Sequence, residues 1–480
     1  MRFLLTLLAV GLTAMPAAAL QSNLPAQLSK ETQACLDCHR DDNPGLYQQW
    51  GAGKHYGANV GCYECHQADK NDPDVLRDDD HADFVISTIV SPKDCGRCHS
   101  KEVDEFVNSH HAKAGRIMGS LDNLLAEVIE GNNGFVTPMF PNGISAAAVN
   151  GCWQCHGSVV RVDKDGTLDP ATWPNTGVGR VNPDGSEGSC TACHQRHEFS
   201  AAQARHPDNC GRCHLGPDHP QKEIYEESKH GIAFRAHIDD MNLDSSKWIV
   251  GQDYSAAPTC ATCHMSATSS QDITHNVGLR IKWNNRPPRS KLAHETDARW
   301  GLDSQKILAD ARRENMKEVC SNCHQARFVD DFFVQYEGLL ALYDAKFAKP
   351  GLELYGAAVA VLKSDPEYVQ FSRPIDWTWF EIWHHEGRRA RHGASMQAPD
   401  YTHWHGTYDL AKHWMSEFVP EIKDIIHEYR DKAPNEVKAL EAKLDEVTNS
   451  DDWKWSINRE DPKVKQEREK RQREFEARYK

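Results

Sequence analysis

Large apolar side chains recur at three- and four-residue steps along three stretches of the C-terminal third. The stretches run from Asp331 to Lys349, from Trp414 to Tyr429 and from Val437 to Val447. This spacing is typical of amphipathic helices that bury one face. Pro420 falls inside the second stretch and predicts a kink there. The pattern predicts a helical bundle whose aromatic faces form its core or an oligomer contact.

The chain before these stretches shows no sustained alternation of apolar and polar residues, so a regular sheet is not expected. Turn-forming segments such as Asn182 to Gly185 predict loops between short helices. We expect a mainly α fold with little regular sheet. A first domain covers residues 20–330, a helical domain covers 331–458, and residues 459–480 form a tail. The dense mixed charge of the tail predicts a solvated helix or a frayed end.

The first twenty residues are typical of an export signal. Arg2 precedes an apolar run from Phe3 to Leu12, and Ala17 to Ala19 offer a small-residue cleavage site. This order is that of a secretory signal peptide, which we place at residues 1–19. The alternative is an N-terminal anchor, although the run is short for a membrane span. We expect a mature chain without a membrane span, located in the periplasm.

The composition narrows the choice of partners. The chain has 480 residues and a net charge of −15, from 55 Lys and Arg against 70 Asp and Glu. An acidic surface argues against nucleic acid or an anionic membrane as the main partner.

All 16 cysteines belong to one motif, C-x-x-C-H, which occurs eight times. This is the attachment pattern of c-type haem: the two thiols bond the porphyrin and the histidine binds the iron. Zinc is the main alternative, but each copy supplies only three zinc ligands. A disulfide within each motif would leave the eight histidines unexplained. The motifs, numbered 1 to 8 in chain order, are Cys35-x-x-Cys38-His39, Cys62-x-x-Cys65-His66, Cys95-x-x-Cys98-His99, Cys152-x-x-Cys155-His156, Cys190-x-x-Cys193-His194, Cys210-x-x-Cys213-His214, Cys260-x-x-Cys263-His264 and Cys320-x-x-Cys323-His324.

Second axial ligands are expected from the remaining histidines rather than from methionines, of which the chain has only nine, dispersed along it. The chain has 26 histidines, and eight belong to the motifs, which leaves 18. A haem with two histidine ligands only transfers electrons, whereas chemistry on a small molecule needs one open iron position. His427 lies on a charged amphipathic stretch and is expected to be a surface residue. The candidates for second ligands are His55, His110, His111, His230, His275, His294, His384, His385, His392, His403 and His405.

The segment from Trp383 to Met396 and the one from Asp400 to Tyr408 are dense in histidine and arginine. The arginines are candidates to pair with haem propionates, and the histidines to complete the coordination of late haems.

Together with the eight motifs, these segments (HHEGRRARHGASM and DYTHWHGTY) resemble the octahaem hydroxylamine oxidoreductase family. Further similar stretches are CTACHQRHEFS, CGRCHLGPDHP, YEESKHG, PTCATCHMS and WNNRPP. The resemblance implies a helical haem domain, a helical bundle and a homotrimer. It also implies that one haem oxidises hydroxylamine, or reduces nitrite or hydroxylamine, while seven others carry electrons.

The resemblance also implies roles for particular residues. The active haem is the fourth, here bound by Cys152, Cys155 and His156. Arg196 and His197 are candidates for an anion-binding and a proton-shuttling group, with sixth-ligand use as the alternative for His197. Tyr254 is a weaker pocket candidate. In oxidative members a tyrosine from the adjacent subunit is bonded to the active haem; Tyr401 is the best match here and Tyr408 the second.

Three hypotheses follow from the sequence. The first is oxidation of hydroxylamine to nitric oxide or nitrite. The second is the reduction of nitrite or hydroxylamine by a protein without the tyrosine crosslink. The third is a cytochrome that only transfers electrons. All three need a redox partner, which we expect to be a cytochrome or a quinone-linked protein.

Overall fold

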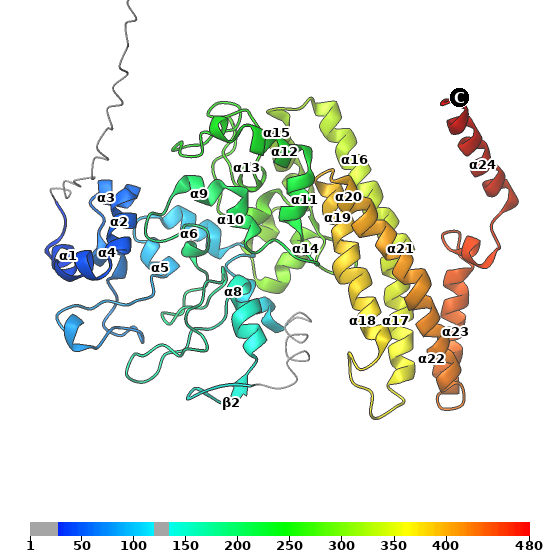
Figure 1. Ribbon diagram of the computed structural model, residues 1–480, viewed down its shortest axis with the longest axis horizontal. Coiled ribbons are helices and arrows are strands. Elements are labelled where there is room, and N and C mark those ends of the chain that lie inside the picture. Colours follow the sequence, from blue (N-terminus) through cyan, green and yellow to red (C-terminus); the bar gives the residue numbers. More distant parts are fainter. Residues whose placement is uncertain (1–26, 120–133) are drawn as a thin grey trace, which may run out of the picture.

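The computed structural model describes residues 27–119 and 134–480. The expected signal peptide, residues 1–19, lies outside the described residues. Figure 1 shows an elongated molecule with many short helices and loops at the N-terminal end and long helices at the C-terminal end. The predicted fold class, mainly α with little sheet, is confirmed.

Short helices carry the region of the C-x-x-C-H motifs. They are α1 (Lys30–Asp42), α2 (Pro44–Ala52), α3 (Lys54–Gly57), α4 (Cys62–His66), α5 (Pro92–Cys95), α6 (Ser100–Val107), α8 (Trp153–His156), α9 (Ala201–Arg205), α10 (Pro207–Gly211), α11 (Gln221–Glu227), α12 (Lys229–Ala236), α13 (Cys260–His264), α14 (Ala293–Asp297) and α15 (Ala309–Ser321). The described residues also form two antiparallel two-stranded sheets, which pair β1 (Phe135–Thr137) with β2 (Phe140–Ile144) and β3 (Trp283–Asn284) with β4 (Lys291–Leu292).

Capping residues fix where several of these helices begin. The side chain of Ser29 accepts a hydrogen bond from the backbone N–H of Thr32 at the start of α1, and Ser228 does the same for Gly231 in α12. Thr259 caps α13 by accepting from the backbone N–H of Thr262. Such bonds satisfy N–H groups that lack a partner within the helix. The caps on α12 and α13 hold His230 and motif 7 in place.

Long helices and π-helical turns form the C-terminal region. They are α16 (Ala326–Tyr343), η9 (Asp344–Ala348), α17 (Lys349–Leu362), α18 (Pro374–Phe380), η10 (Glu381–Glu386), α19 (Gly387–Ser395), α20 (Pro399–Thr402), η11 (His403–Tyr408), α21 (Asp409–His413), η12 (Trp414–Phe418), α22 (Val419–Tyr429), α23 (Pro434–Thr448) and α24 (Pro462–Ala477). Pro420 lies in the first turn of α22, where proline is tolerated because its missing N–H has no partner there. The helix changes at η12, one turn before Pro420, from α to π geometry.

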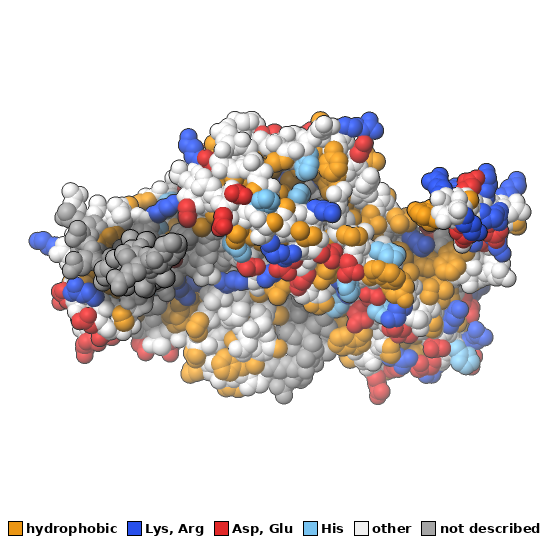
Figure 2. Space-filling view, turned by 45° about the horizontal axis from the view of Figure 1, so that its top comes forward, with side chains coloured by type: hydrophobic (Ala, Val, Ile, Leu, Met, Phe, Trp, Pro, Cys, Tyr) orange, Lys and Arg blue, Asp and Glu red, His pale blue; other side chains and the backbone are white. Residues whose placement is uncertain are grey.

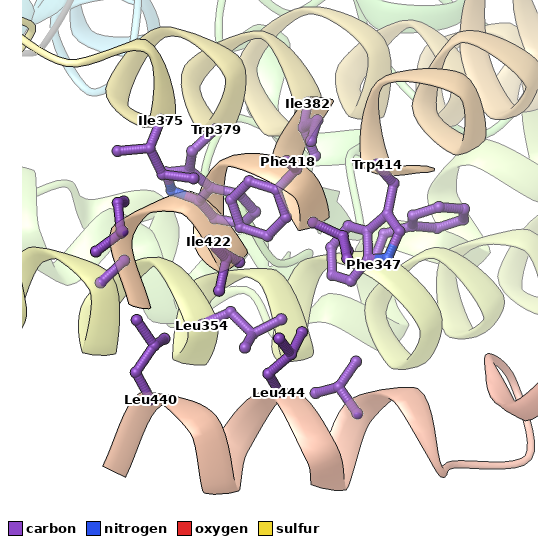
Figure 3. Packing of buried hydrophobic residues seen from close by; sticks show 14 of the residues in the cluster. Phe347, Leu354, Ile375, Trp379, Ile382, Trp414, Phe418, Ile422, Leu440 and Leu444 are labelled. Atoms are coloured by element: carbon purple, nitrogen blue, oxygen red, sulfur yellow. The ribbon is translucent and has the colours of Figure 1, made fainter. Parts of the chain in front are cut away.

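The apolar stripes seen in the sequence meet in one large core in this region. Tyr343, Leu354, Ile422 and Leu440 are among its buried members. Figure 3 shows Leu354 of α17 between the aromatic residues of α18 and η12 and the leucines of α23. The haem-motif region has only small apolar clusters, such as the one around Trp248 and Tyr254.

The charged tail forms the helix α24, which buries none of its residues. Figure 2 shows its Lys and Arg side chains gathered at one end of the molecule, while Asp and Glu side chains lie across the middle of the same face. Ion pairs between Glu467 and Arg471 and between Glu469 and Arg473 stabilise the helix from within. None of the helices in the described residues is both long and apolar enough to span a bilayer.

The core of the bundle can be tested with two leucines of one helix. Leu354 is fully buried and Leu352, in the same helix, is 45% exposed. We expect Leu354→Ala to lower the free energy of unfolding by about 2–5 kcal/mol. Leu352→Ala is the matched control and should change it by less than about 0.5 kcal/mol. Denaturant unfolding followed by far-UV circular dichroism checks both; equal losses would contradict the assigned core.

Candidate functional site

The 16 motif cysteines are all free thiols, and each is half-buried or exposed. Motifs 2 and 7 each form a single helical turn, α4 and α13. Two thiols one turn apart lie on one side of that turn, with the following histidine beside them. The thiols are therefore reachable, and placed on one side, as covalent attachment of a porphyrin requires.

Four motif histidines each face a histidine from a distant part of the chain. An imidazole nitrogen binds a metal at about 2 Å, so two rings on opposite sides of one iron have centres about 6 Å apart. The donor sets of motifs 1, 3, 5 and 8 therefore fit a haem held between two histidines. The ring centroids are separated by 6.2 Å for His39 and His81, 6.1 Å for His55 and His99, 6.3 Å for His194 and His275, and 6.0 Å for His230 and His324.

His55, His230 and His275 were among the candidates from the sequence, whereas His81 was not. His81 follows Asp78, Asp79 and Asp80 in an exposed acidic stretch, and its Nδ1 contacts the Asp78 carboxylate at 2.6 Å. Its surroundings resemble those of an ordinary surface histidine. Only the fold brings it opposite His39.

His197 lies beside motif 2. Burial lowers the pKa of His197 to about 4, and the charges of His66 and Arg196 act in the same direction. Arg196 in turn lies 6.0 Å from the ring centre of Trp173. The arrangement brings His197 and His66 together, as the alternative role of His197 as a sixth ligand requires.

Motifs 4, 6 and 7 meet at a group of histidines. The rings of His111 and His214 are 6.0 Å apart. His111 is also close enough to His156 and His264 for their charges to affect its pKa, and burial lowers that pKa to about 4. His392 of α19 lies beside His214, and burial lowers its pKa to about 3. These imidazoles are neutral near pH 7, as iron ligands must be.

The buried ring nitrogens that make no hydrogen bond among the described residues include Nδ1 of His264 and Nδ1 of His275. A buried polar atom without a partner is costly, so such atoms usually mark a missing ligand or ion. His264 is the histidine of motif 7, and His275 faces His194, the histidine of motif 5. Their environment fits a bound group at these motifs.

Other candidate histidines lie elsewhere. His110 places Nε2 2.9 Å from the buried carboxylate of Asp297. His294 accepts a hydrogen bond from the backbone N–H of Ala309. His384 and His385 pack against Phe380. His403 and His405 are exposed, and His405 pairs with Asp400 at 3.2 Å.

Contacts between thiols join the motifs into a branched series. The pairs of motifs 1 and 2, 3 and 5, 4 and 6, and 6 and 7 each place a cysteine of one motif beside a cysteine of the other. Cysteines close enough to affect each other's pKa also connect motif 2 to 3, motif 5 to 6 and motif 7 to 8. The series therefore runs 1–2–3–5–6–7–8, with motif 4 attached to motif 6. The adjacent pairs are Cys35 with Cys62, Cys95 with Cys190, Cys155 with Cys213, and Cys210 with Cys260; the pairs connected through their charges are Cys65 with Cys95, Cys193 with Cys210, and Cys263 with Cys320.

Motif 4 differs from the others in its backbone. The π-helical turn η3 (Ala148–Cys152) leads into it, and Gly157, with a φ of 85°, follows it. A side chain at Gly157 would collide with the backbone of Gly179 and Arg180, and one at Gly177 with Gly157 itself. π-helical turns are frequent at functional sites. The glycines allow two backbone segments to cross directly beside the motif.

An acid–base pair that our sequence analysis did not single out lies next to motifs 4 and 6. Asp218 and His219 contact each other through a carboxylate oxygen and Nδ1. Nε2 of His219 lies 2.9 Å from the carbonyl oxygen of Cys213, and both Cys213 and His219 are close enough to Cys155 of motif 4 to affect its pKa. Arg388 of α19 binds the other Asp218 oxygen at 3.2 Å. The stretch CGRCHLGPDHP contains the pair, but adjacency in sequence did not show that it reaches motif 4.

The contact between the carboxylate and the imidazole shifts the pKa of both groups. Burial opposes the charged form of Asp218, but the hydrogen bond and charge of His219 outweigh it and hold the pKa of Asp218 below its usual value. Burial also opposes protonation of His219, yet the same bond raises the pKa of His219. The site can therefore hold a proton beside motif 4 and exchange it.

The predicted tyrosines have different surroundings. Tyr254 is buried, stacks on Trp248 at 4.4 Å and donates its hydroxyl hydrogen bond to Thr262, beside motif 7. Burial raises its pKa to about 12. Tyr401 is half-buried, with its backbone N–H donating to Glu227 of α11. Tyr408 is exposed on η11 and packs edge-on against Trp404.

Two of the three arginines of α19, Arg388 and Arg391, bind protein groups. Besides Asp218, Arg388 binds the carbonyl oxygen of Arg286. Arg391 is fully buried, binds the carbonyl oxygen of Pro287 and lies 4.3 Å from the ring centre of Tyr343. These bonds join the bundle to the haem-motif region.

Comparison with known proteins supports the assignment of the C-x-x-C-H motifs as haem-binding motifs. Three family models match parts of the chain: "Seven times multi-haem cytochrome CxxCH" at residues 184–344, "Cytochrome c7 and related cytochrome c" at 139–215, and "Cytochrome c554 and c-prime" at 12–67. The chain is a multihaem c-type cytochrome, related to hydroxylamine oxidoreductase-like proteins.

The individual proteins that this chain resembles are also named as multihaem or hydroxylamine oxidoreductase-like proteins. A probable nitrite reductase–hydroxylamine oxidoreductase fusion protein of Kuenenia stuttgartiensis is 26% identical over 341 residues, which are 61% of this chain. The match spans about a third (34%) of the length of that relative. A solved structure called a hypothetical multiheme protein is 27% identical with a TM-score of 0.67, covering 81% of this chain and 94% of its own. A reducing HAO-like protein complex of K. stuttgartiensis, 20% identical with a TM-score of 0.52 and 87% coverage of both chains, shares the fold.

The pairing of His39 with His81 can be tested in the haem-loaded protein. We expect His81→Ala to remove one low-spin haem signal and to create one high-spin signal, because one iron loses its second imidazole. Electron paramagnetic resonance and absorption spectra measure both. The control is His427→Ala, which changes an exposed histidine of α22 and should leave the spectra as they were. Unchanged spectra for His81→Ala would refute the pairing.

Proposed function

We propose that this protein is a periplasmic octahaem oxidoreductase that oxidises hydroxylamine to nitric oxide or nitrite. Each C-x-x-C-H motif carries one haem c, and motif 4 carries the catalytic one. The other seven haems have two histidine ligands and relay electrons. The signal peptide pattern at residues 1–19 and the motif class support export to the periplasm.

One observation carries the proposal: the Asp218–His219 pair, held by Arg388, adjoins motif 4. Oxidation of hydroxylamine releases protons together with electrons, so the reacting site needs a group that accepts protons and passes them on. His219 offers this group, and Asp218 orients its ring through Nδ1. Bound haem c supplies an iron that accepts electrons from nitrogen.

The residues around the pair keep it in place. Arg388 fixes the Asp218 carboxylate and lies 5.2 Å from the ring centre of Trp383. Its bond to the carbonyl oxygen of Arg286 leaves the guanidinium little freedom. The acid–base pair is therefore preorganised by the bundle, and the arrangement costs little reorganisation during the reaction.

The branched series of motifs suits an electron relay. Motif 4 is a side branch, so a substrate bound there does not interrupt the series from motif 1 to motif 8. The facing histidines of motifs 1, 3, 5 and 8 close both sides of their irons. We propose His197 as the second iron ligand at motif 2. His111 and His392 are proposed as second ligands within the group of motifs 4, 6 and 7.

We propose that the chain forms a homotrimer and that Tyr401 of one subunit bonds the motif 4 haem of the next, with Tyr408 as the second candidate. Tyr401 and Tyr408 lie on α20 and η11, where His403, Trp404 and His405 are also exposed. An exposed group of aromatic residues is a common feature of protein contacts. The redox partner is proposed to be a cytochrome or quinone-linked protein whose positive surface complements the acidic one seen here.

The direction of catalysis and the tyrosine–haem crosslink are tested together. We expect a tryptic digest of the holoprotein to contain a haem peptide with Cys152 and Cys155 bonded to a second peptide that carries Tyr401 or Tyr408. We also expect the protein to reduce an added electron acceptor when given hydroxylamine. A haem peptide without the second peptide, together with reduction of nitrite or hydroxylamine by a donor dye, would reverse the proposed direction. No turnover and no high-spin haem would leave electron transfer as the function.

The acid–base pair is tested by substitution. We expect His219→Gln and Asp218→Asn to lower kcat for hydroxylamine oxidation by about 10²–10⁴-fold, the usual contribution of a positioned acid–base group. The absorption spectrum of the haems should not change. His237 and Asp240 form an exposed pair with an N···O distance of 3.1 Å, so His237→Gln and Asp240→Asn are matched controls with normal kcat. Normal kcat in the Asp218 and His219 variants would remove the pair from the mechanism.

A further inference from the structure

Five tryptophans of the C-terminal bundle, Trp383, Trp379, Trp414, Trp453 and Trp455, lie between the acid–base pair and the surface. We infer that this series is a route for single electrons, which restores the catalytic site after an accidental oxidation by peroxide. The inference goes beyond the proposed function and rests only on haem being bound at motifs 4 and 6. It does not depend on the direction of nitrogen chemistry.

The outer part of the series consists of three neighbouring indoles. Trp414 and Trp453 stack with ring centroids 5.0 Å apart and an interplanar angle of 12°. Trp455 follows at 6.2 Å from Trp453 and is 48% exposed. Trp414 and Trp453 are almost fully buried. The series therefore reaches solvent at one residue, Trp455.

The middle part joins Trp414 to Trp379. Phe418 lies between them, 5.0 Å from Trp414 and 5.7 Å from Trp379. Figure 3 shows Trp379 and Trp414 on either side of Phe418. A side chain at Gly351 would collide with both Trp379 and Trp414, so the edges of the two indoles converge over the same point of α17. Electron transfer between them need not pass through phenylalanine.

The inner end lies at the acid–base pair. Trp383 follows Trp379 by four residues on the continuous helix of α18 and η10, and both belong to the same buried core. The Arg388 guanidinium lies 5.2 Å from the ring centre of Trp383 and 3.2 Å from the carboxylate of Asp218. One arginine thus separates the first indole from the residues beside motif 4.

Two cations determine how strong an oxidant is needed to remove an electron from these tryptophans. Arg388 faces Trp383, and the Lys346 ammonium lies 4.9 Å from the ring centre of Trp453. A cation over an indole stabilises the neutral ring and opposes its oxidation. Ordinary turnover therefore does not draw electrons from these residues. Only a strongly oxidised centre, more oxidising than the ferric haems of the relay, does so.

Hydrogen peroxide takes two electrons and two protons from the site and its solvent and becomes two molecules of water. The two missing electrons are supplied one after the other by the indole of Trp383, and each deficit moves through Trp379, Trp414 and Trp453 to Trp455. Each time, the oxidised Trp455 loses its indole proton to water. A small reductant in solution, such as ascorbate or a thiol, then returns one electron, and water returns the proton, so two passages and two electrons from the reductant restore the site.

The test uses the purified, fully ferric holoprotein treated with hydrogen peroxide. We expect freeze-quench electron paramagnetic resonance to show a tryptophan radical, and peptide mass spectrometry to find oxidation concentrated at Trp455. Trp377 is 37% exposed and lies outside both the series and the proposed trimer contact, so it reports direct attack from solution. Preference for Trp455 over Trp377 is the expected result. Equal oxidation of the two would overturn the inference.

Two variants interrupt the route without removing its aromatic packing. Trp453→Phe should lower oxidation at Trp455 at least fivefold and should speed the loss of haem absorbance. Trp455→Phe, at the surface, should leave oxidation trapped at Trp453. The matched control is Trp377→Phe, a partly exposed residue packed on Phe371, which should behave as the unaltered protein. Oxidation at Trp455 that persists in Trp453→Phe would refute the route.

The same samples separate this inference from the proposed function. Haem absorbance confirms loading, and each variant is assayed with hydroxylamine. A Trp453→Phe protein with normal turnover and faster peroxide damage supports the route alone. Normal turnover in the unaltered protein without any tryptophan oxidation sinks the route and leaves the proposed function standing.

Discussion

The spacing of facing imidazoles is the constraint on which the haem-motif region depends. Each C-x-x-C-H motif places two porphyrin-bonding thiols and one iron ligand in one short segment, and the opposite ligand arrives from elsewhere in the chain. Four such pairs have ring centroids 6.0–6.3 Å apart. A pair of this kind joins two segments as a metal site does, so the region can be ordered by its ligands with little apolar core of its own. The bundle, in contrast, is held by a conventional core.

The two regions also differ in how far the sequence predicts them. The bundle follows from apolar periodicity: the stripe through Tyr336, Leu340 and Tyr343 is buried in α16 as expected. The motifs predict the haem class because both porphyrin-bonding cysteines and one iron-binding histidine lie within five residues. The opposite ligands do not follow from sequence, since their identity depends on long-range folding. His81 shows this most clearly, because its acidic neighbours give no sign of a ligand.

The acid–base pair illustrates a second limit. Asp218 and His219 lie four and five residues after His214, yet they matter because Cys213 and Cys155 bring motifs 6 and 4 together. No local pattern encodes that contact. Placement of His197 beside His66, and of Tyr254 in the packed group around motif 7, depends on the same kind of long-range arrangement.

The attachment of motif 4 to motif 6, in the interior of the series, has a further consequence. A reaction centre at the end of a line can discharge in one direction only, and any slow step along the line limits it. A centre attached at an interior point feeds two arms, one towards motif 1 and one towards motif 8. If motif 4 holds the proposed reaction centre, the arms end at different motifs, so a filled arm does not block the other. The molecule would then work as a three-way junction in which charge divides between two outlets.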